Sequence, residues 1–322
     1  MEFIDVVRLN LLSPMVLAFV LGVIAVLVKS NLHIPEQVYD VISIYLLFAI
    51  GLKGGFDLAK SSQAGLGGAL LVAVVVGALI PLWSWWILTR LGKFSDADAV
   101  ALGIHYGGVS AVTLSACVTF LAQIGEPSEG FMPTMYVFIE LPAVVVGLML
   151  ANARLSGANR LKLGEVVRSA FTGKSFLLLG GGLIIGIVSG EMGQKQVAPF
   201  FHDLFSGFLT LFLLEMGTLV GKRLKDLKQV GFFLVGFGVV MPILHGALGV
   251  LLSSLVGLSV GGCMLMGAML ASASYITAPA IAQTNIPQAN PSYYLTASLV
   301  ITFPFNIIFG LPLFYQLAVW LA

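Results

Sequence analysis

The chain has 322 residues, of which 58% are hydrophobic and only 10% are charged, and its net charge is +1. Soluble globular proteins carry about 25% charged residues, so this composition excludes an ordinary soluble domain and predicts a protein covered mainly by lipid. The length suffices for about ten membrane spans of roughly 20 residues each. No basic stretch is interleaved with aromatic residues, so nothing indicates nucleic-acid binding.

Ten apolar segments follow one another along the chain, with ends defined to about two to four residues. They cover residues 11–29, 39–58, 64–91, 97–124, 131–153, 174–190, 203–221, 229–254, 259–284 and 291–318. The most polar interval, 154–173, divides them into five and five. We therefore expect an all-α membrane protein with a first five-helix repeat (1–153), a cytoplasmic connector (154–173) and a second five-helix repeat (174–322).

The two halves share helix-bending residues in the same order. The partners lie 161–166 residues apart and are Gly51 with Gly217, Gly77–Pro81 with Gly238–Pro242, and Glu140–Pro142 with Thr302–Pro304. Single glycine or proline matches are weak because both residues are common in membrane helices. An ordered series at nearly one spacing favours a repeat, and an odd number of spans per half predicts that the second half is inverted in the membrane.

The distribution of Lys and Arg predicts the orientation, because these residues accumulate in cytoplasmic loops. Alternate assignment of the loops puts four on the side of the two termini, namely Arg8, Lys53, Lys60 and Lys195. The other twelve fall on the opposite side. We therefore expect both termini outside and the connector in the cytoplasm.

The fourth and ninth apolar segments are interrupted by small polar residues at matching places. With Gly103–Ser115 aligned on Gly267–Pro279, Ser110 falls on Ser274 and Thr113 on Thr277. Matched helix breaks in the two halves of a membrane protein are the best sequence indication of a transporter's binding site. We expect helices 4 and 9 to cross near the midplane.

A helix that resumes after a break presents free N–H groups and the positive end of its dipole, which together attract anions. Unwound carbonyls and hydroxyls also suit Na⁺. The predicted substrate site comprises Gly107, Gly108, Ser110, Thr113, Ser115, Ser272, Ser274 and Thr277. The alternative is that these small residues serve only close helix packing.

Two acids lie well inside the apolar segments, and ionisable groups there are functional by default. We interpret Glu140, just before Pro142, as a coupling-cation or proton site, and thus as a possible Na⁺ ligand. Glu215 is a weaker candidate, for which pairing with Lys53 is a hypothesis. His105 either lines the cavity or packs in the core.

Enzyme functions are disfavoured. The chain lacks an H-E-x-x-H helix and a Walker loop, and Gly108–Val112 lacks the second glycine of a nucleophile elbow. Its two cysteines, Cys117 and Cys263, lie in apolar runs and are expected to be buried small hydrophobes, with no cofactor implied. Without an ATP-binding loop, uphill movement would depend on an ion gradient.

The chain resembles the cyanobacterial-type sodium-dependent bicarbonate transporter family along nearly its whole length. The similar stretches are Ser13-Pro14, Ile50–Gly55, Gly107–Ser110 with Thr113, Phe138–Ala143, Ala271–Ser274 and Ile286–Ser292. The resemblance implies a gate domain from helices 1, 2, 6 and 7 and a core domain from helices 3–5 and 8–10. It also implies bicarbonate and Na⁺ at the crossing, a homotrimer and a PII-like cytoplasmic regulator.

Two departures from the family bear on function. The family's second break reads Ser-Ser-Ser-Asp, where this chain has Ser272-Ala273-Ser274-Tyr275. Tyr275 removes a charge that would suit Na⁺, so its part in a coupling-ion site with Ser274 and Glu140 is open. The short connector also leaves regulation by a PII-like protein open.

The sequence therefore predicts a sodium symporter that imports bicarbonate or a similar small anion by alternating access, as a multi-pass protein of a bacterial plasma (inner) membrane. One alternative is a cation/proton antiporter of related fold, in which Glu140 carries the proton. Another is a membrane receptor or scaffold that binds without transport.

Overall fold

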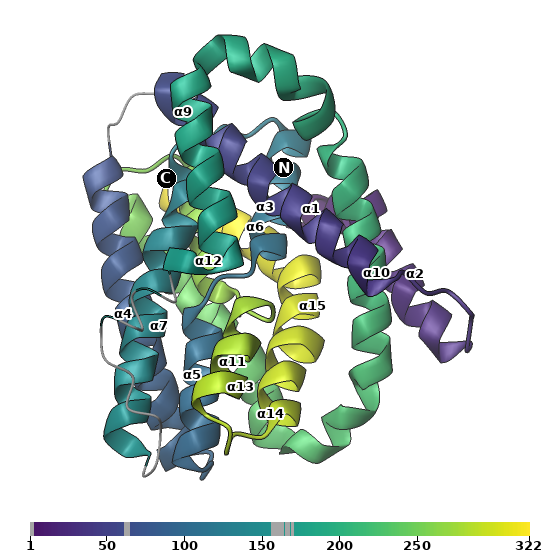
Figure 1. The fold of residues 1–322 in the computed structure, drawn as a ribbon, viewed down its shortest axis with the longest axis vertical. Coiled ribbons are helices and arrows are strands. Elements are labelled where there is room, and N and C mark those ends of the chain that lie inside the picture. The colour runs from purple at the N-terminus through teal and green to yellow at the C-terminus, as the bar shows by residue number, and fades with distance from the viewer. Residues whose placement is uncertain (1–2, 61–64, 156–163, 165–167, 169–170) are drawn as a thin grey trace.

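The computed structural model describes residues 3–60, 65–155, 164, 168 and 171–322, and in these residues every regular element is helical (Figure 1). The predicted all-α fold is thus confirmed for the part of the chain described. The predicted connector, 154–173, lies largely outside these residues, and with it the surface on which a PII-like regulator was expected.

The helices of the first half follow the first five apolar segments. They are α1 (Phe3–Leu11), α2 (Pro14–Leu27), α3 (Glu36–Lys60), α4 (Leu66–Arg90), α5 (Asp96–Gly107), α6 (Ala111–Ile124), the 3-10 turn η1 (Met132–Thr134) and α7 (Met135–Arg154). Ser13 and Ser95 begin α2 and α5 by accepting the N–H of Val16 and Asp98, as N-cap residues do.

The second half is also helical, with a more irregular backbone. Its elements are α9 (Lys174–Phe201), α10 (Phe205–Arg223), η2 (Leu224–Asp226), α11 (Leu227–Leu255), α12 (Val260–Ala271), α13 (Thr277–Asn285), α14 (Pro291–Leu295), η3 (Thr296–Thr302), α15 (Phe303–Phe305), η4 (Asn306–Gly310) and α16 (Leu311–Leu321). The stretches η3 and η4 are π-helical. The π-helix is rare overall, but where it occurs it is often found at a functional site.

Seven of the described helices are long and apolar enough to cross a membrane, or eight if the α1–α2 pair, bent by 58°, is one span. This number is below ten for two reasons. The continuous helical run Phe205–Leu255 covers two predicted segments, and α12, with 12 residues, is short because its segment is broken. The ten-span inverted topology stays a prediction.

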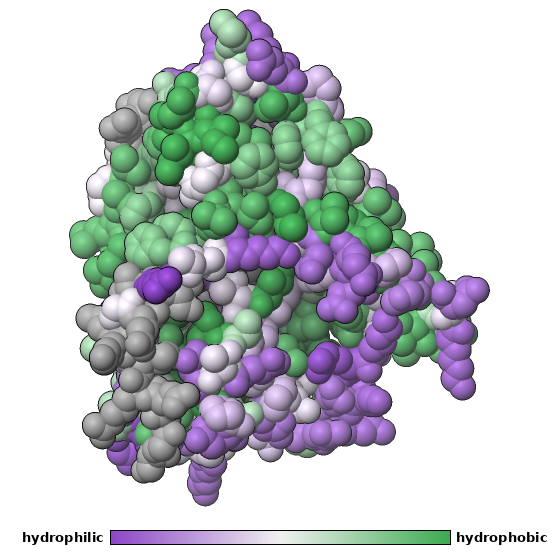
Figure 2. Space-filling model, viewed as in Figure 1, coloured by the Kyte–Doolittle hydropathy of each residue, from purple (hydrophilic) through white to green (hydrophobic). Residues whose placement is uncertain are grey.

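The surface carries the apolar side chains that lipid contact requires. Figure 2 shows a broad belt of hydrophobic residues across the upper half of one face, with hydrophilic residues at its tip and along the lower part. Large apolar side chains such as Phe232, Val188 and Trp320 are 98%, 81% and 78% exposed. Water would disfavour such exposure, whereas a bilayer accepts it.

Two close helix crossings join the halves. In the first, α3 packs along α9, with Gly51 and Gly55 against Gly182 and Gly186; a Cβ at Gly55 would lie 2.2 Å from the Leu183 carbonyl oxygen. Such small-xxx-small patterns let membrane helices approach closely.

The second crossing places α2 along α10, where a Cβ at Gly22 would lie 2.1 Å from the Leu214 oxygen and one at Gly217 2.0 Å from the Phe19 oxygen. Gly217 is the predicted repeat partner of Gly51. The two crossings therefore use corresponding helices from opposite halves.

The remaining helices form a second packed group. The helix α4 lies beside α7 and α5, and α11 lies beside α12 and η3 (Figure 1). Gly77 of α4 meets the Ile139 carbonyl of α7, while its predicted repeat partner Gly238 of α11 meets the side chain of Ile301. This group contains both breaks, α5–α6 and α12–α13.

The glycine crossing of α3 and α9 gives a direct test. Gly182→Leu should destabilise the protein by about 1–3 kcal/mol or more through overpacking, because its Cβ would lie 2.9 Å from the Phe48 carbonyl oxygen. Gly181→Leu is the matched control, since a Cβ there meets nothing within 4 Å. Equal melting temperatures of the two detergent-solubilised variants would contradict this account.

Candidate functional site

After each break, a serine hydroxyl accepts an N–H from the first turn of the half-helix that follows. Ser110 is the N-cap of α6 and its Oγ accepts the Thr113 N–H at 3.1 Å. Ser274 Oγ accepts the Ala278 N–H at 3.2 Å at the start of α13. The two serines that the repeat alignment pairs therefore make the same type of local contact.

The breaks also hydrogen-bond to one another. The N–H of Ser110 donates to Ser272 Oγ at 2.8 Å, and the N–H of Ser274 donates to the carbonyl of His105 at 2.8 Å. Ser272 Oγ in turn donates to the Met269 carbonyl at 2.7 Å, within the last turn of α12. Each break thus satisfies a backbone donor of the other, as hydrocarbon surroundings require.

The glycines of the first break permit this approach. A Cβ at Gly108 would lie 2.7 Å from Ser274 Cβ, and one at Gly107 would lie 2.8 Å from both Ala143 Cβ and Pro81 Cγ. The sequence interpretation gave both glycines to backbone approach toward a ligand. In the structure Gly108 faces Ser274 of the second break, whereas Gly107 packs against α7 and α4.

A small cavity of about 10 Å³ lies at the crossing, which is close to the volume that one water occupies. Residues of both breaks line it together with one tyrosine of α7: Val109, Ser110, Ala111, Tyr136, Ser274, Tyr275 and Ile276. Ser110 Oγ donates to Tyr275 Oη at 3.2 Å. The crossing is therefore closed around its hydroxyls, with the Tyr275 hydroxyl against Ser110.

The other predicted hydroxyls of the first break are placed differently. Thr113 is 1% exposed, and its Oγ1 has no hydrogen-bond partner among the described residues. Ser115 Oγ donates to the Ala111 carbonyl at 2.8 Å within α6. Of the two, Thr113 keeps its hydroxyl available, whereas Ser115 is bound to its own helix.

Glu140 connects α7 to the second break. It is buried, 9% exposed, and its carboxyl group is hydrogen-bonded to the side chains of Tyr136 and Thr277. Thr277 is the first residue of α13 and Tyr136 lines the cavity. A carboxylate therefore stands one side chain away from the crossing, although Glu140 itself is not among the lining residues.

Several residues that support the site were missed from sequence. Asn306 Nδ2 donates to the Ala271 carbonyl at 2.8 Å, at the end of α12, and its Oδ1 has no partner among the described residues. Asn10 Nδ2 donates to the carbonyls of Ile307 and Ile308 at 2.7 and 3.1 Å, in π-helical η4. Asn306 could have been identified from sequence, because it is a polar residue inside an apolar segment.

His105 contributes its backbone and not its ring. The ring is fully buried, Nδ1 lies 2.7 Å from the Ala101 carbonyl, and the imidazole stacks on Tyr294 at 4.4 Å between centroids. Of the two interpretations left open by the sequence, the structure supports packing for the side chain. The carbonyl at the same position is what reaches the second break.

The hypothesis of a Glu215–Lys53 pair is wrong for this structure. No ion pair joins them, and Glu215 lies within electrostatic reach of Tyr39, near the start of α3. Lys53 is fourteen residues further along the same helix, which is about 21 Å at 1.5 Å per residue. The predicted correspondence of Gly51 with Gly217 suggested that Lys53 and Glu215 could meet. In the structure these two side chains are not paired.

The chemistry available at the crossing is that of hydroxyls, helix N-termini and one nearby carboxyl group. The first-turn N–H groups of α6 and α13 that the two serine hydroxyls do not accept have no acceptors within their own helices, so they can bind a small anion. Hydroxyl oxygens and Glu140 offer oxygen ligands to Na⁺. In the part of the chain described, no three His, Cys, Asp or Glu side chains gather as a metal site.

Comparison with a curated protein gives a partial likeness. A thiol:disulfide interchange protein DsbD from Pasteurella multocida is 27% identical over 168 residues, which cover 48% of this chain and 28% of that protein. The chain therefore spans less than a third of that relative's length. Cys117 and Cys263 are free and buried.

A protein-family comparison covers nearly the whole chain. Residues 14–319, which run from the start of α2 into α16 and include both breaks, match the Na⁺-dependent bicarbonate transporter superfamily. This is a family of transporters and not of enzymes. The chain belongs to the Na⁺-dependent bicarbonate transporter superfamily.

Proposed function

We propose that this protein imports bicarbonate by Na⁺ symport, with the anion bound where the two breaks cross. The observation that carries the proposal is the reciprocal bonding of the breaks, Ser110 N–H to Ser272 Oγ and Ser274 N–H to the His105 carbonyl. It brings two half-helix N-termini and several hydroxyls together in one buried place. Such an arrangement favours a small, singly charged anion over a bulky one.

The ligands that we assign to the anion are Ser110, Thr113 and the N–H groups of the first turn of α6 on one side. On the other side we assign Ser272, Ser274 and Thr277. The cavity of about 10 Å³ is too small for bicarbonate, so binding requires that the crossing widen. Withdrawal of the Tyr275 hydroxyl from Ser110 would open the lining directly.

We assign the coupling Na⁺ to the neighbourhood of Glu140, whose carboxyl group is hydrogen-bonded to Thr277. Na⁺ prefers oxygen ligands, and Thr277 belongs to the same turn that faces the anion site. Electrostatic attraction between the two ions would then favour their joint binding. Tyr275 is neutral, so it can offer only its hydroxyl oxygen to this site.

For alternating access, we propose that the pairs α2–α10 and α3–α9 form a gate, and that α4–α7 with α11–α16 form the core that carries the site. The glycine crossings within the gate support this division, since they hold each pair as a closely packed unit. The ten-span inverted topology, both termini outside a bacterial inner membrane, and a homotrimer complete the proposal.

Uptake of labelled bicarbonate into proteoliposomes tests the activity. An inward Na⁺ gradient should drive accumulation, and replacing Na⁺ with K⁺ should abolish it. Uptake indifferent to Na⁺ would contradict symport. A Na⁺-dependent pH change without bicarbonate uptake would instead favour the antiporter alternative, and binding without flux would favour a receptor.

Ser110→Ala and Ser274→Ala test the site. Each should raise the KM for bicarbonate about tenfold or more, because a hydrogen bond to a charged group contributes roughly 1.5–3 kcal/mol. Ser253→Ala is the control, since Ser253 is equally buried but lies in α11 away from the breaks. Transport unchanged in both site variants would remove the assignment.

Glu140→Gln tests the cation assignment. The variant keeps the side chain's shape but lacks the charge, so the apparent affinity for Na⁺ should fall at least tenfold while the KM for bicarbonate at saturating Na⁺ changes less. Initial uptake rates measured across a Na⁺ series give both quantities. An unchanged Na⁺ dependence would assign Glu140 a packing role only.

A further inference from the structure

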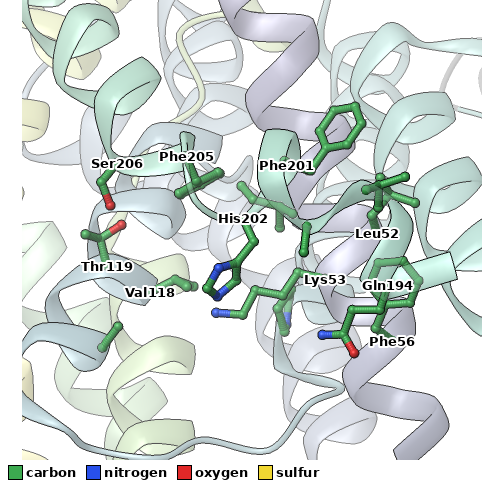
Figure 3. A pocket seen from close by; sticks show the side chains of 16 residues that line it. Leu52, Lys53, Phe56, Val118, Thr119, Gln194, Phe201, His202, Phe205 and Ser206 are labelled. Atoms are coloured by element: carbon green, nitrogen blue, oxygen red, sulfur yellow. The ribbon is translucent and has the colours of Figure 1, made fainter. Parts of the chain in front are cut away.

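A second cavity, of about 170 Å³, lies away from the crossing, between α6 on one side and α3, α9 and α10 on the other (Figure 3). Most of its wall is apolar, formed by residues such as Leu52, Phe56 and Val118. The polar groups in the wall are Lys53, Thr119, Gln194, His202 and Ser206. The proposed function makes no use of these residues.

Lys53 supplies the ammonium group of this cavity, and His202 supplies an imidazole. Lys53 comes from α3 and His202 from the residue that ends α9, and Figure 3 shows the ammonium group and the imidazole ring directed toward one another beside Val118. No described carboxylate lies within ion-pairing distance of Lys53 Nζ, and none lines the cavity. Lys53 is therefore an unpaired ammonium group on a largely apolar wall.

Three charged groups lie around this pair, and two of them are acidic. Asp57, one turn beyond Lys53 on α3, is within electrostatic reach of both Lys53 and His202. Asp203 Oδ1 lies 2.9 Å from His202 Nδ1, which leaves Nε2 of the ring free to face another partner. Lys60 Nζ donates to Gln194 Oε1 at 2.6 Å, at the edge of the cavity.

The cavity and the crossing share helix α6. Ser110 caps the start of α6, and Val118 lies eight residues later, a distance of about 12 Å along the helix axis. The cavity also lies between the helices assigned to the gate and those assigned to the core. The cavity therefore lies along the same helix whose first turn carries the hydroxyls of the first break.

We propose that this cavity is an anion vestibule, in which the Lys53 ammonium group, with the His202 imidazole beside it, concentrates small oxyanions before they reach the crossing. Clefts lined by one sign of charge with apolar walls raise the local concentration of the opposite ion and its rate of association. The anion's identity as bicarbonate rests on the proposed function, whereas the charge selectivity of the vestibule does not. The predicted orientation places Lys53 and Lys195 on the outer face, so the vestibule would serve uptake.

A chemical test of charge selectivity needs no transport. Ser206, an exposed lining residue, is changed to Cys in a chain whose buried Cys117 and Cys263 are changed to Ala. The rates of modification by an anionic and by a cationic methanethiosulfonate are then compared in phosphatidylcholine proteoliposomes. The anionic reagent should react faster, and the ratio of rates should fall on the order of tenfold in the Lys53→Gln, His202→Gln double variant.

Lys195→Gln is the matched control, because Lys195 is an exposed lysine of α9 on the same face but does not line the cavity. It should leave the rate ratio nearly unchanged. A ratio that is the same in the double variant and in its parent would overturn the vestibule. Size-exclusion profiles, and each single variant measured alone, separate loss of charge from loss of folding.

The kinetics of bicarbonate uptake give a second measurement. Lys53→Gln with His202→Gln should raise the KM for bicarbonate several-fold with little change in kcat, and the difference from the parent should shrink as ionic strength rises and screens the charges. A lowered kcat at unchanged KM would oppose a steering role. If no bicarbonate uptake is found but the reagent ratio behaves as expected, the proposed function fails and the vestibule stands.

Discussion

The constraint on which this structure depends is that a helix broken inside a membrane must find partners for its backbone within the protein. Here the two breaks find them in each other, through Ser110 N–H to Ser272 Oγ and Ser274 N–H to the His105 carbonyl. The breaks are stable only as a pair, so the crossing must be buried and the residues around it must be small. The need for small residues is met where Gly108 lies against Ser274.

The same requirement for close approach shapes the rest of the molecule at a larger scale. The crossings α3–α9 and α2–α10 are built on glycines from opposite halves, and neither tolerates a Cβ without backbone movement. The breaks lie in a separate group of helices, α4–α7 and α11–α16. The boundary between the two groups is therefore where cavities can form, and the cavity with Lys53 and His202 lies on it.

Much of this architecture could be predicted from the sequence, because it follows from local patterns. The apolar segments and the places of the two breaks depend on residues close together in the chain. The equivalence of Ser110 with Ser274 rests on a repeat that stays a prediction. What could not be predicted is which groups meet when they lie far apart in the chain. The role of the His105 carbonyl, the packing of Gly107 on Ala143 and the closeness of Lys53 to His202 are set by tertiary register.

The hydrogen bonds at the crossing differ in how easily they can be broken. The backbone contacts between them are 2.8 Å long, whereas Ser110 Oγ and Tyr275 Oη are 3.2 Å apart, beyond the usual range for two hydroxyls. A neutral hydrogen bond of this kind contributes about 0.5–1.5 kcal/mol at most. The Tyr275 ring also packs edge-on against Phe303, which packs edge-on against Phe19 of α2. The weakest hydrogen bond at the crossing, between Ser110 and Tyr275, is therefore linked by two aromatic contacts to the helix pair assigned to the gate. A shift of α2 relative to the breaks would displace Tyr275 first. Only a larger shift would affect the hydrogen bonds of the Ser110 and Ser274 N–H groups that hold the crossing together.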